Sequence, residues 1–194
     1  MPDNKLKIIL ASQSPRRKQL LEWAEINFDV ITSDADESFS TNMPVEEIPI
    51  FIARNKAKAV QQKLNSDAII LAADTIVVLG NKVINKPASR DEAIKMLQSL
   101  SGNEHRVITG VVLLSGDKEL SFADVTHVLF HELSEEQIIF YVDKYKPYDK
   151  AGAYAIQEWI GVTGIKSING DFYNVMGLPV SRVLQQLKHF TTAL

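Results

Sequence analysis

The chain has 194 residues, of which 45% are hydrophobic and 23% are charged, and its formal net charge at pH 7 is -3. This composition is typical of a globular protein, and the net negative charge gives no support to non-specific binding of nucleic acid. Because the chain has no cysteine, disulfides, thiolate catalysis and cysteine-based zinc sites are excluded. The apolar stretch at residues 7–11 is shorter than a signal peptide or a membrane helix requires, so we expect a soluble, cytoplasmic protein.

Apolar runs and amphipathic segments alternate along the chain, which predicts an α/β or α+β fold. In chain order we expect a strand at 7–11, a helix that begins at Pro15 after the N-cap Ser14, a strand at 28–31, a loop at 34–43, a helix at 49–64, apolar runs at 68–73 and 76–79, a helix at 89–100 with a Ser89/Glu92 capping box, strands at 106–114 and 120–130, a helix at 135–145 with a Ser134/Gln137 capping box, and a C-terminal helix opened by Pro179. The loops around Lys86 and Lys146 are the expected positions of a junction between two lobes.

A first candidate site lies between the first strand and the first helix, at Ser12, Ser14, Arg16 and Arg17. A helix N-terminus offers unpaired N–H groups and partial positive charge, and hydroxyl and guanidinium donors would add to an anion site for a polyphosphate. The simpler interpretation is a helix start with solvated arginines. Two cations at that end oppose the helix dipole, which is unusual for side chains without a role, and this segment alone leaves both interpretations open.

Acidic side chains form a second candidate site. Asp74, followed by Thr75, comes after the apolar run 68–73, and a carboxylate at the end of an apolar strand is well placed to be a metal ligand or a general base. Glu37 or Asp36 could complete the site, because Mg²⁺ takes one or two carboxylates with phosphate oxygens and water. Otherwise Asp74 caps a turn and the acidic loop is solvated.

Lysines and one glutamine supply further candidates. Lys56, in a predicted helix, and Lys86, in a turn, are point charges that suit phosphates, although exposed lysines explain them equally well. The segment 148–157 contains Lys150 and Gln157, and its small residues would let the backbone approach a flat ligand. The Gln157 amide can offer a donor and an acceptor to a base edge. A packed turn that leads into a strand is the simpler interpretation.

Other common sites are disfavoured. The four histidines show no metal-ligand spacing, and neither GxGxxG nor a Walker A sequence occurs. The Gly-containing loop 169–174 is typical of a turn before a helix.

Taken together, these segments resemble the Maf family of nucleoside triphosphate pyrophosphatases, also named septum-formation inhibitors. The motifs occur in one order along almost the whole chain: SQSPRRKQLL near the start, DES at 36–38, ARNKA at 53–57, AADTIV at 72–77, NKP at 85–87, HRVITGV at 105–111, KPYDKAGAYAIQ at 146–157 and GDFYNVMGLPV at 170–180. Several motifs in one order are far more specific than any one of them.

The resemblance implies an ITPase-like α/β fold for residues 1–194, a single domain with a long twisted mixed sheet flanked by helices and two lobes with a central cleft. It also implies a divalent metal cation, Mg²⁺ or Mn²⁺, and a homodimer. The segment KAGAYAIQ looks like the branch that acts on dTTP and UTP. Ala155 stands where glycine is usual in that motif, and Glu158-Trp159 follows Gln157 where glycine often does.

We therefore predict hydrolysis of dTTP or UTP, or of modified pyrimidine nucleotides, to the nucleoside monophosphate and pyrophosphate. The candidate residues are Asp74 as general base with Lys56, Lys86 and Glu37 in catalysis; Asp74 and Glu37 as metal ligands; and Ser12, Ser14, Arg16, Arg17, Thr75, Lys150 and Gln157 in substrate binding. In this hypothesis water attacks the α-phosphorus and pyrophosphate leaves. Positioning and charge neutralisation drive the reaction, so no Ser or Cys nucleophile is needed.

Two alternatives belong to other functional classes. A nucleotide-binding regulator of septum formation or cell division would bind nucleotide with little turnover. A nucleic-acid-binding module would use Arg16, Arg17 and Lys18, but the acidic balance and the lack of a basic stripe interleaved with aromatics disfavour it. We accordingly expect neither a nucleic-acid nor a membrane partner.

Overall fold

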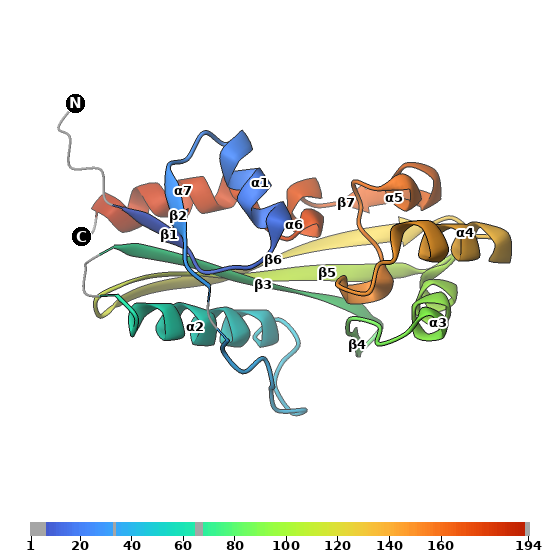
Figure 1. Cartoon of the computed structure of the whole chain (residues 1–194), viewed down its shortest axis with the longest axis horizontal. Helices are drawn as coiled ribbons and strands as arrows, with labels where there is room; N and C mark the ends of the chain where they lie inside the picture. Colours follow the sequence, from blue (N-terminus) through green and yellow to red (C-terminus); the bar gives the residue numbers. More distant parts are fainter. Residues whose placement is uncertain (1–6, 33, 65–67, 193–194) are drawn as a thin grey trace. The chain divides into compact units, whose positions relative to one another are not determined.

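The fold is organised around one mixed seven-stranded sheet, as the computed structural model shows (Figure 1). It describes residues 7–32, 34–64 and 68–192. The elements are β1 (Ile8–Leu10), α1 (Pro15–Trp23), β2 (Phe28–Val30), α2 (Ile48–Gln61), β3 (Ile69–Leu79), β4 (Lys82–Ile84), α3 (Arg90–Leu100), β5 (Glu104–Ser115), β6 (Lys118–Phe130), α4 (Glu135–Tyr145), η1 (Ala151–Ala153), α5 (Trp159–Gly164), β7 (Ile165–Asn169), α6 (Phe172–Met176) and α7 (Val180–Thr192).

The strand order is β2-β1-β3-β5-β6-β7, and β4 pairs with β3. β1 runs parallel to both β2 and β3, whereas β4 is antiparallel to β3 and β7 is antiparallel to β6. The predicted α/β class, with a mixed sheet flanked by helices, is thereby confirmed.

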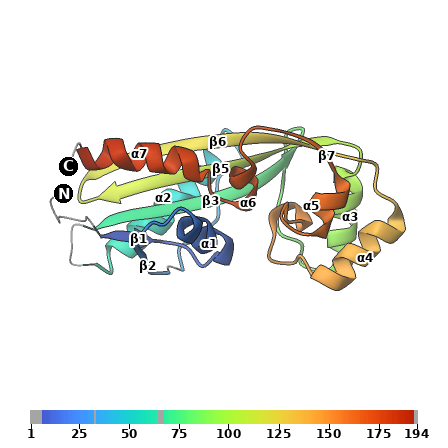
Figure 2. The same ribbon diagram turned by 90° about the horizontal axis from the view of Figure 1, so that it is seen from above.

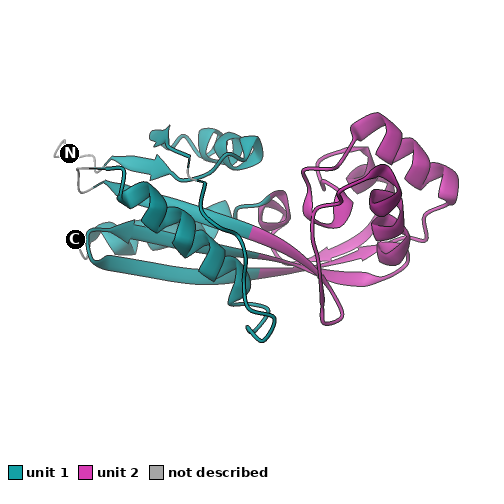
Figure 3. Ribbon diagram, turned by 60° about the horizontal axis from the view of Figure 1, so that its bottom comes forward, with its two compact units in different colours: residues 1–74, 109–124, 177–194 teal, residues 75–108, 125–176 magenta. Residues whose placement is uncertain are grey.

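The chain divides into two compact units (Figure 3). Unit 1 comprises residues 1–74, 109–124 and 177–194, and unit 2 comprises residues 75–108 and 125–176. The divisions fall within β3, β5 and β6 and after α6, so the predicted junctions in the loops around Lys86 and Lys146 are wrong. Strands of 11–13 residues are long enough to contribute to two cores, which a loop-based prediction cannot detect. The single domain with two lobes and a central cleft stays a prediction.

In unit 1, α2 covers one face of the sheet, and α1 and α7 cover the other (Figure 1). Side chains alternate between the two faces of a strand, which sends every second apolar residue toward α2. The core on that face contains Ile9, Ala11, Ala53, Ala57, Val60, Ala68, Ile70, Ala72, Val112 and Leu114. Gly110 of β5 lets the start of α2 approach, since a Cβ there would lie 2.2 Å from the Ile50 backbone nitrogen.

β3 corrects one expectation that matters for the site. The runs 68–73 and 76–79 belong to one strand of 11 residues, so Asp74 and Thr75 lie in its middle and not at a strand end. Backbone groups make the hydrogen bonds of a sheet, so two half-buried polar side chains need not interrupt it. β4, which pairs with the end of β3, had no sequence prediction.

In unit 2, α3 packs against α4 and η1, and α5 lies beside them (Figure 2). The segment 148–157 does not lead into a strand, because η1 is followed by a turn and then by α5. The loop 169–174 contains the start of α6.

None of the described helices has the length and apolar character to span a bilayer.

Helix N-termini follow the predicted caps in part. Ser134 forms a complete capping box with Gln137. The Ser89 hydroxyl accepts the Glu92 N–H at 3.2 Å, but the Glu92 carboxylate accepts the N–H of Ala88 and not that of Ser89. Ser14 stands at the N-cap of α1, where its side chain makes no capping hydrogen bond to a described residue.

Candidate active site

The loop between β1 and α1 places a buried arginine beside two serines. Arg17 is 8% exposed; its Nε donates to the Gly177 carbonyl at 2.8 Å, and its Nη1 donates to the Ser12 hydroxyl at 3.3 Å. The Ser12 hydroxyl also accepts the Ser14 N–H at 3.1 Å. The interpretation of Arg17 as a solvated side chain is therefore wrong, whereas Arg16 is half-exposed.

Acidic side chains lie within electrostatic reach of this arginine. Burial lowers the pKa of Arg17, the Asp74 carboxylate raises it, Arg16 lowers it and the Glu37 carboxylate raises it. The start of α1 therefore shares one electrostatic environment with Asp74 and Glu37. These two carboxylates come from the middle of β3 and from the loop 34–43.

Lys56 of α2 connects the two carboxylates. Its Nζ lies 2.7 Å from Asp74 Oδ1 and 2.7 Å from Glu37 Oε1. The Lys56 and Asp74 side chains are each 13% exposed and that of Glu37 is 49% exposed. Unit 1 thus brings together three of the predicted catalytic residues, and the order of exposure places the Glu37 carboxylate nearest to solvent.

The donor set fits a metal shared with substrate better than a metal held by protein alone. Among the described residues no group of three or more His, Cys, Asp and Glu side chains could hold a metal ion. Asp74 and Glu37 supply two hard carboxylates, and both contact the Lys56 ammonium. Mg²⁺ completes such a pair of carboxylates with phosphate oxygens and water. The residue types therefore fit Mg²⁺ or Mn²⁺ bound together with a triphosphate.

The remaining candidates lie in unit 2. Lys86 is exposed, and the Gly152 N–H donates to the carbonyl of the preceding Asn85 at 3.2 Å, so η1 lies beside the turn 85–87. Lys150 is buried and Gln157 is exposed. Thr75 is half-buried in β3.

The small residues of η1 serve packing. Gly152 has φ +72°, and a Cβ there would lie 3.1 Å from the Val77 side chain of β3. The small residues therefore let the backbone of η1 lie close to β3. Their predicted contact with a flat ligand stays a prediction.

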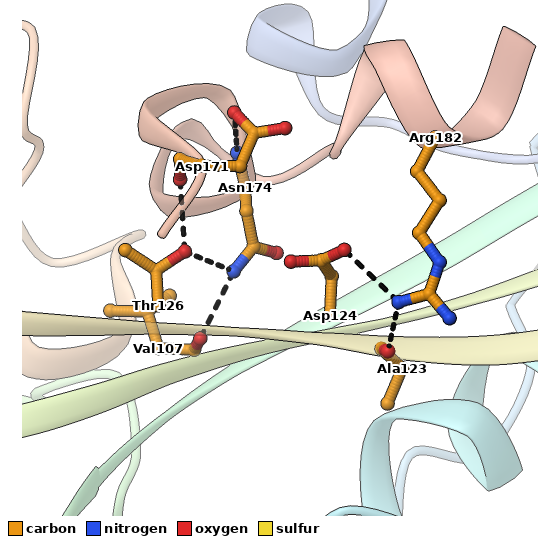
Figure 4. A network of polar contacts seen from close by, with 7 residues as sticks. All are labelled: Val107, Ala123, Asp124, Thr126, Asp171, Asn174 and Arg182. Atoms are coloured by element: carbon orange, nitrogen blue, oxygen red, sulfur yellow. Dashed lines mark hydrogen bonds and ion pairs between the residues drawn. The ribbon is translucent and has the colours of Figure 1, made fainter. Parts of the chain in front are cut away.

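A polar network around α6 was missed by the sequence interpretation (Figure 4). The buried Asn174 amide donates to the Val107 carbonyl at 3.1 Å and to the Thr126 hydroxyl at 3.0 Å. The Asp171 carboxylate accepts the N–H groups of Tyr173 and Asn174. This network anchors α6 to β5 and β6, immediately before Gly177, the acceptor for Arg17. The pattern Asp-x-x-Asn ahead of an apolar run could have indicated a capped helix.

Arg182 anchors α7 in a similar way within unit 1. Its Nη1 donates to the Ala123 carbonyl at 2.8 Å and lies 3.1 Å from Asp124 Oδ2 (Figure 4). Its guanidinium also lies over the Phe122 ring, 4.4 Å from the centroid. Periodicity predicted α7 but gave no sign of these contacts to β6.

The chain is similar in sequence to known proteins over almost its whole length. The sequence profile of the family described as Maf-like protein matches residues 7–190. The chain is 51% identical over 187 residues to the dTTP/UTP pyrophosphatase of Parabacteroides distasonis, covering 96% of this chain and 97% of that protein. It is 54% identical over 181 residues to the dTTP/UTP pyrophosphatase of Cytophaga hutchinsonii, covering 93% of this chain and 83% of that protein. Among solved structures, the Staphylococcus aureus Ham1 protein aligns with a TM-score of 0.43 and 18% identity over 65% of this chain and 72% of that chain.

Proposed function

The chain belongs to the Maf family, and from that premise we propose that it hydrolyses dTTP and UTP to the nucleoside monophosphate and pyrophosphate. The relatives with about half of their residues identical carry the name dTTP/UTP pyrophosphatase. The structural observation that supports this proposal most lies in unit 1, where Lys56 contacts two carboxylates that also interact electrostatically with the buried Arg17. Such a set suits a reaction that depends on neutralising phosphate charge and placing a water molecule.

The triphosphate binds at the start of α1. The first turn of α1 contains no acidic residue, so no carboxylate there opposes an anion at the positive end of the helix dipole. Ser12 and Ser14 add hydroxyl donors, and Arg16 and Arg17 add guanidinium groups. The contact of Arg17 with Gly177 fixes its side chain before substrate arrives, which reduces the entropy lost on binding.

Asp74 acts as the general base. Its carboxylate is mostly buried and is held at 2.7 Å by the Lys56 ammonium, so its orientation is set by a charge-assisted hydrogen bond. From this position it accepts a proton from the water that attacks the α-phosphorus. Pyrophosphate leaves with charge that Lys56 and Lys86 help to neutralise.

Asp74 and Glu37 also hold the divalent cation, Mg²⁺ or Mn²⁺. When bound, the ion neutralises the charge of the phosphate oxygens and helps to orient the triphosphate. Glu37 is the more exposed of the two ligands, which suits a metal that arrives with the nucleotide.

In unit 2, Gln157 reads the pyrimidine edge, and Lys150 and Thr75 complete substrate binding. The exposed Gln157 amide can both donate and accept a hydrogen bond. We further propose that the protein works in the cytoplasm as a homodimer without nucleic-acid or membrane partners. Light scattering coupled to size exclusion tests the homodimer.

Pyrophosphate release from canonical and modified nucleoside triphosphates tests the activity, with Mg²⁺, Mn²⁺ or EDTA in parallel. We expect metal-dependent release from dTTP and UTP, with the matching monophosphate as product. Turnover of other nucleotides alone would keep the reaction and refute the base assignment. Nucleotide binding without turnover would favour the regulator of septum formation.

A further inference from the structure

The turn that presents Gln157 is held by a chain of hydrogen bonds that the proposed chemistry does not use. Ala155 and Ile156, which precede Gln157, are 5% and 3% exposed, whereas Gln157 itself is exposed. The Ala155 N–H donates to the Tyr141 hydroxyl oxygen at 3.2 Å. The Tyr141 hydroxyl in turn donates to the Glu158 carboxylate. The residues on both sides of Gln157 are thereby tied to one buried side chain of α4.

Glu158 also contacts Lys150, which lies eight residues earlier in the chain. Lys150 Nζ lies 3.6 Å from Glu158 Oε1 and 2.8 Å from Asp149 Oδ1. The side chains of Lys150 and Glu158 are 10% and 22% exposed, so their charges are only partly screened by solvent. The two oxygens of one carboxylate thus engage two partners, the Tyr141 hydroxyl through Oε2 and the Lys150 ammonium through Oε1.

The backbone around Gln157 is closely packed. The Glu158 N–H donates to the Ala155 carbonyl at 3.1 Å, and the Gly161 N–H donates to the Glu158 carbonyl at 2.9 Å. A Cβ at Gly161 would lie 1.7 Å from the Ile156 carbonyl oxygen. The start of α5 therefore folds back on the turn at a distance that a larger residue could not reach, which leaves the turn little freedom.

We propose that Glu158, together with Tyr141, is a positioning residue that sets base specificity by fixing Gln157 and Lys150. This inference rests on the proposed function, in which Gln157 reads the base and Lys150 binds substrate. A glutamine amide can exchange its donor and acceptor by rotation of the side chain. The exocyclic group at C4 is a hydrogen-bond acceptor in uracil and thymine and a donor in cytosine. A fixed backbone limits the positions that the amide can take, and the Lys150 ammonium, which Glu158 contacts, has donors alone and cannot make this exchange. The wrong base then leaves polar groups unpaired, which is how hydrogen-bonding sites reject an analogue.

Glu158→Gln is the principal test, because it keeps the size of the side chain and an acceptor for Tyr141 but removes the charge that faces Lys150. We expect the KM for dTTP to rise about 10-fold while kcat changes less than about 3-fold, and the preference for dTTP over dCTP in kcat/KM to fall about 10-fold. Tyr141→Phe should lower the same preference with a smaller change in KM, because it releases Ala155 but keeps the contact between Glu158 and Lys150.

Asp143→Asn is the matched control. Asp143 lies on the same helix as Tyr141 and forms an exposed ion pair with Arg90 at 2.6 Å. Its variant should keep the wild-type KM and the wild-type preference. If E158Q keeps them too, or if kcat falls with no change in preference, the positioning role is refuted, whatever happens to the melting temperature.

The wild-type protein separates this inference from the proposed function. Absence of pyrophosphate release from dTTP and UTP refutes the activity alone. Equilibrium dialysis with dTTP and with dCTP in EDTA then decides the positioning role without turnover. A wild-type preference that E158Q loses supports the role, and an equal preference in both proteins, or none in either, overturns it.

Discussion

At the scale of single residues, the environment of Asp74 predicts that this carboxylate is needed for turnover. Its carboxylate is 13% exposed and bonded to Lys56, so replacement by asparagine keeps the volume and a hydrogen-bond acceptor but removes the base. We expect Asp74→Asn to lower the turnover of dTTP by about 10²- to 10⁴-fold, the usual contribution of general acid–base catalysis. Pyrophosphate release measures the loss, and circular dichroism with thermal unfolding checks that the variant folds.

Asp124→Asn is the comparison for this variant. Asp124 is also a largely buried carboxylate of unit 1, with a side chain 19% exposed and paired with Arg182 at 3.1 Å, but it has no part in the proposed chemistry. Its variant should lose stability and keep turnover. If both variants retain full turnover, Asp74 has no catalytic role.

Part of the candidate site could be predicted at the residue scale, because some of its members are unusual residue types for their local segment. Asp74 interrupts an apolar run, and Arg17 opposes the dipole of α1, so each violates a local rule and marks itself as unusual. Contacts between distant segments could not be predicted. The Gly177 carbonyl that holds Arg17 lies 160 residues away in sequence, and the link from Tyr141 to Glu158 depends on how α4 meets α5.

At the scale of elements, the approach of α2 to β5 positions Lys56. A Cβ at Gly110 would lie 2.2 Å from the Ile50 nitrogen and 2.3 Å from the Pro49 carbonyl carbon. Both are backbone atoms, so no change of rotamer relieves the clash and α2 has to shift. We expect Gly110→Ala to lower the free energy of unfolding by about 3 kcal/mol or more, and to lower turnover because Lys56 moves with the helix. Urea unfolding and pyrophosphate release measure the two effects.

Gly116→Ala separates the clash from the general cost of replacing a glycine. Gly116 has φ +54° in the turn between β5 and β6, and a Cβ there meets nothing within 4 Å. Its variant should cost about 1–2 kcal/mol from the left-handed conformation and should keep turnover. Equal losses in the two variants would show that α2 adapts freely.

The same elements explain where sequence patterns succeed. A 3.6-residue period and a capping box predict helices such as α4, and a long apolar run predicts strands such as β5. The pattern fails for β4 and β7, which have three and five residues and few buried side chains, because short strands depend on their neighbours for pairing. It also fails for the continuity of β3, where sheet pairing overrides two polar residues.

At the scale of the whole molecule, stability should depend on pH through one buried histidine. His105 is 1% exposed in the core of unit 2, where its Nε2 lies 2.7 Å from the Tyr154 hydroxyl and its ring packs edge-to-face on Phe130. Burial lowers the pKa of His105 to about 4, an effect partly offset by a hydrogen bond to the backbone of Asn103, which raises the pKa. Burial also raises the pKa of Tyr154, so its hydroxyl keeps its proton.

The sign of the dependence follows from linkage. Above pH 6.5 the histidine is neutral in the folded and unfolded chains and costs nothing. As the pH falls from 6.5 toward 4, the unfolded chain binds a proton that the folded chain does not, so the free energy of unfolding decreases by up to about 3 kcal/mol.

Carboxylates titrate in the same range, and the double variant H105F/Y154F isolates the histidine because it replaces both hydrogen-bonding partners and leaves no buried polar group unpaired. Urea unfolding at pH 7 and pH 4 should show wild type losing about 3 kcal/mol more than the double variant. Equal losses would mean that His105 is protonated in the folded protein, and its burial would then have to be relieved by a movement of β5 or of the segment that carries Tyr154.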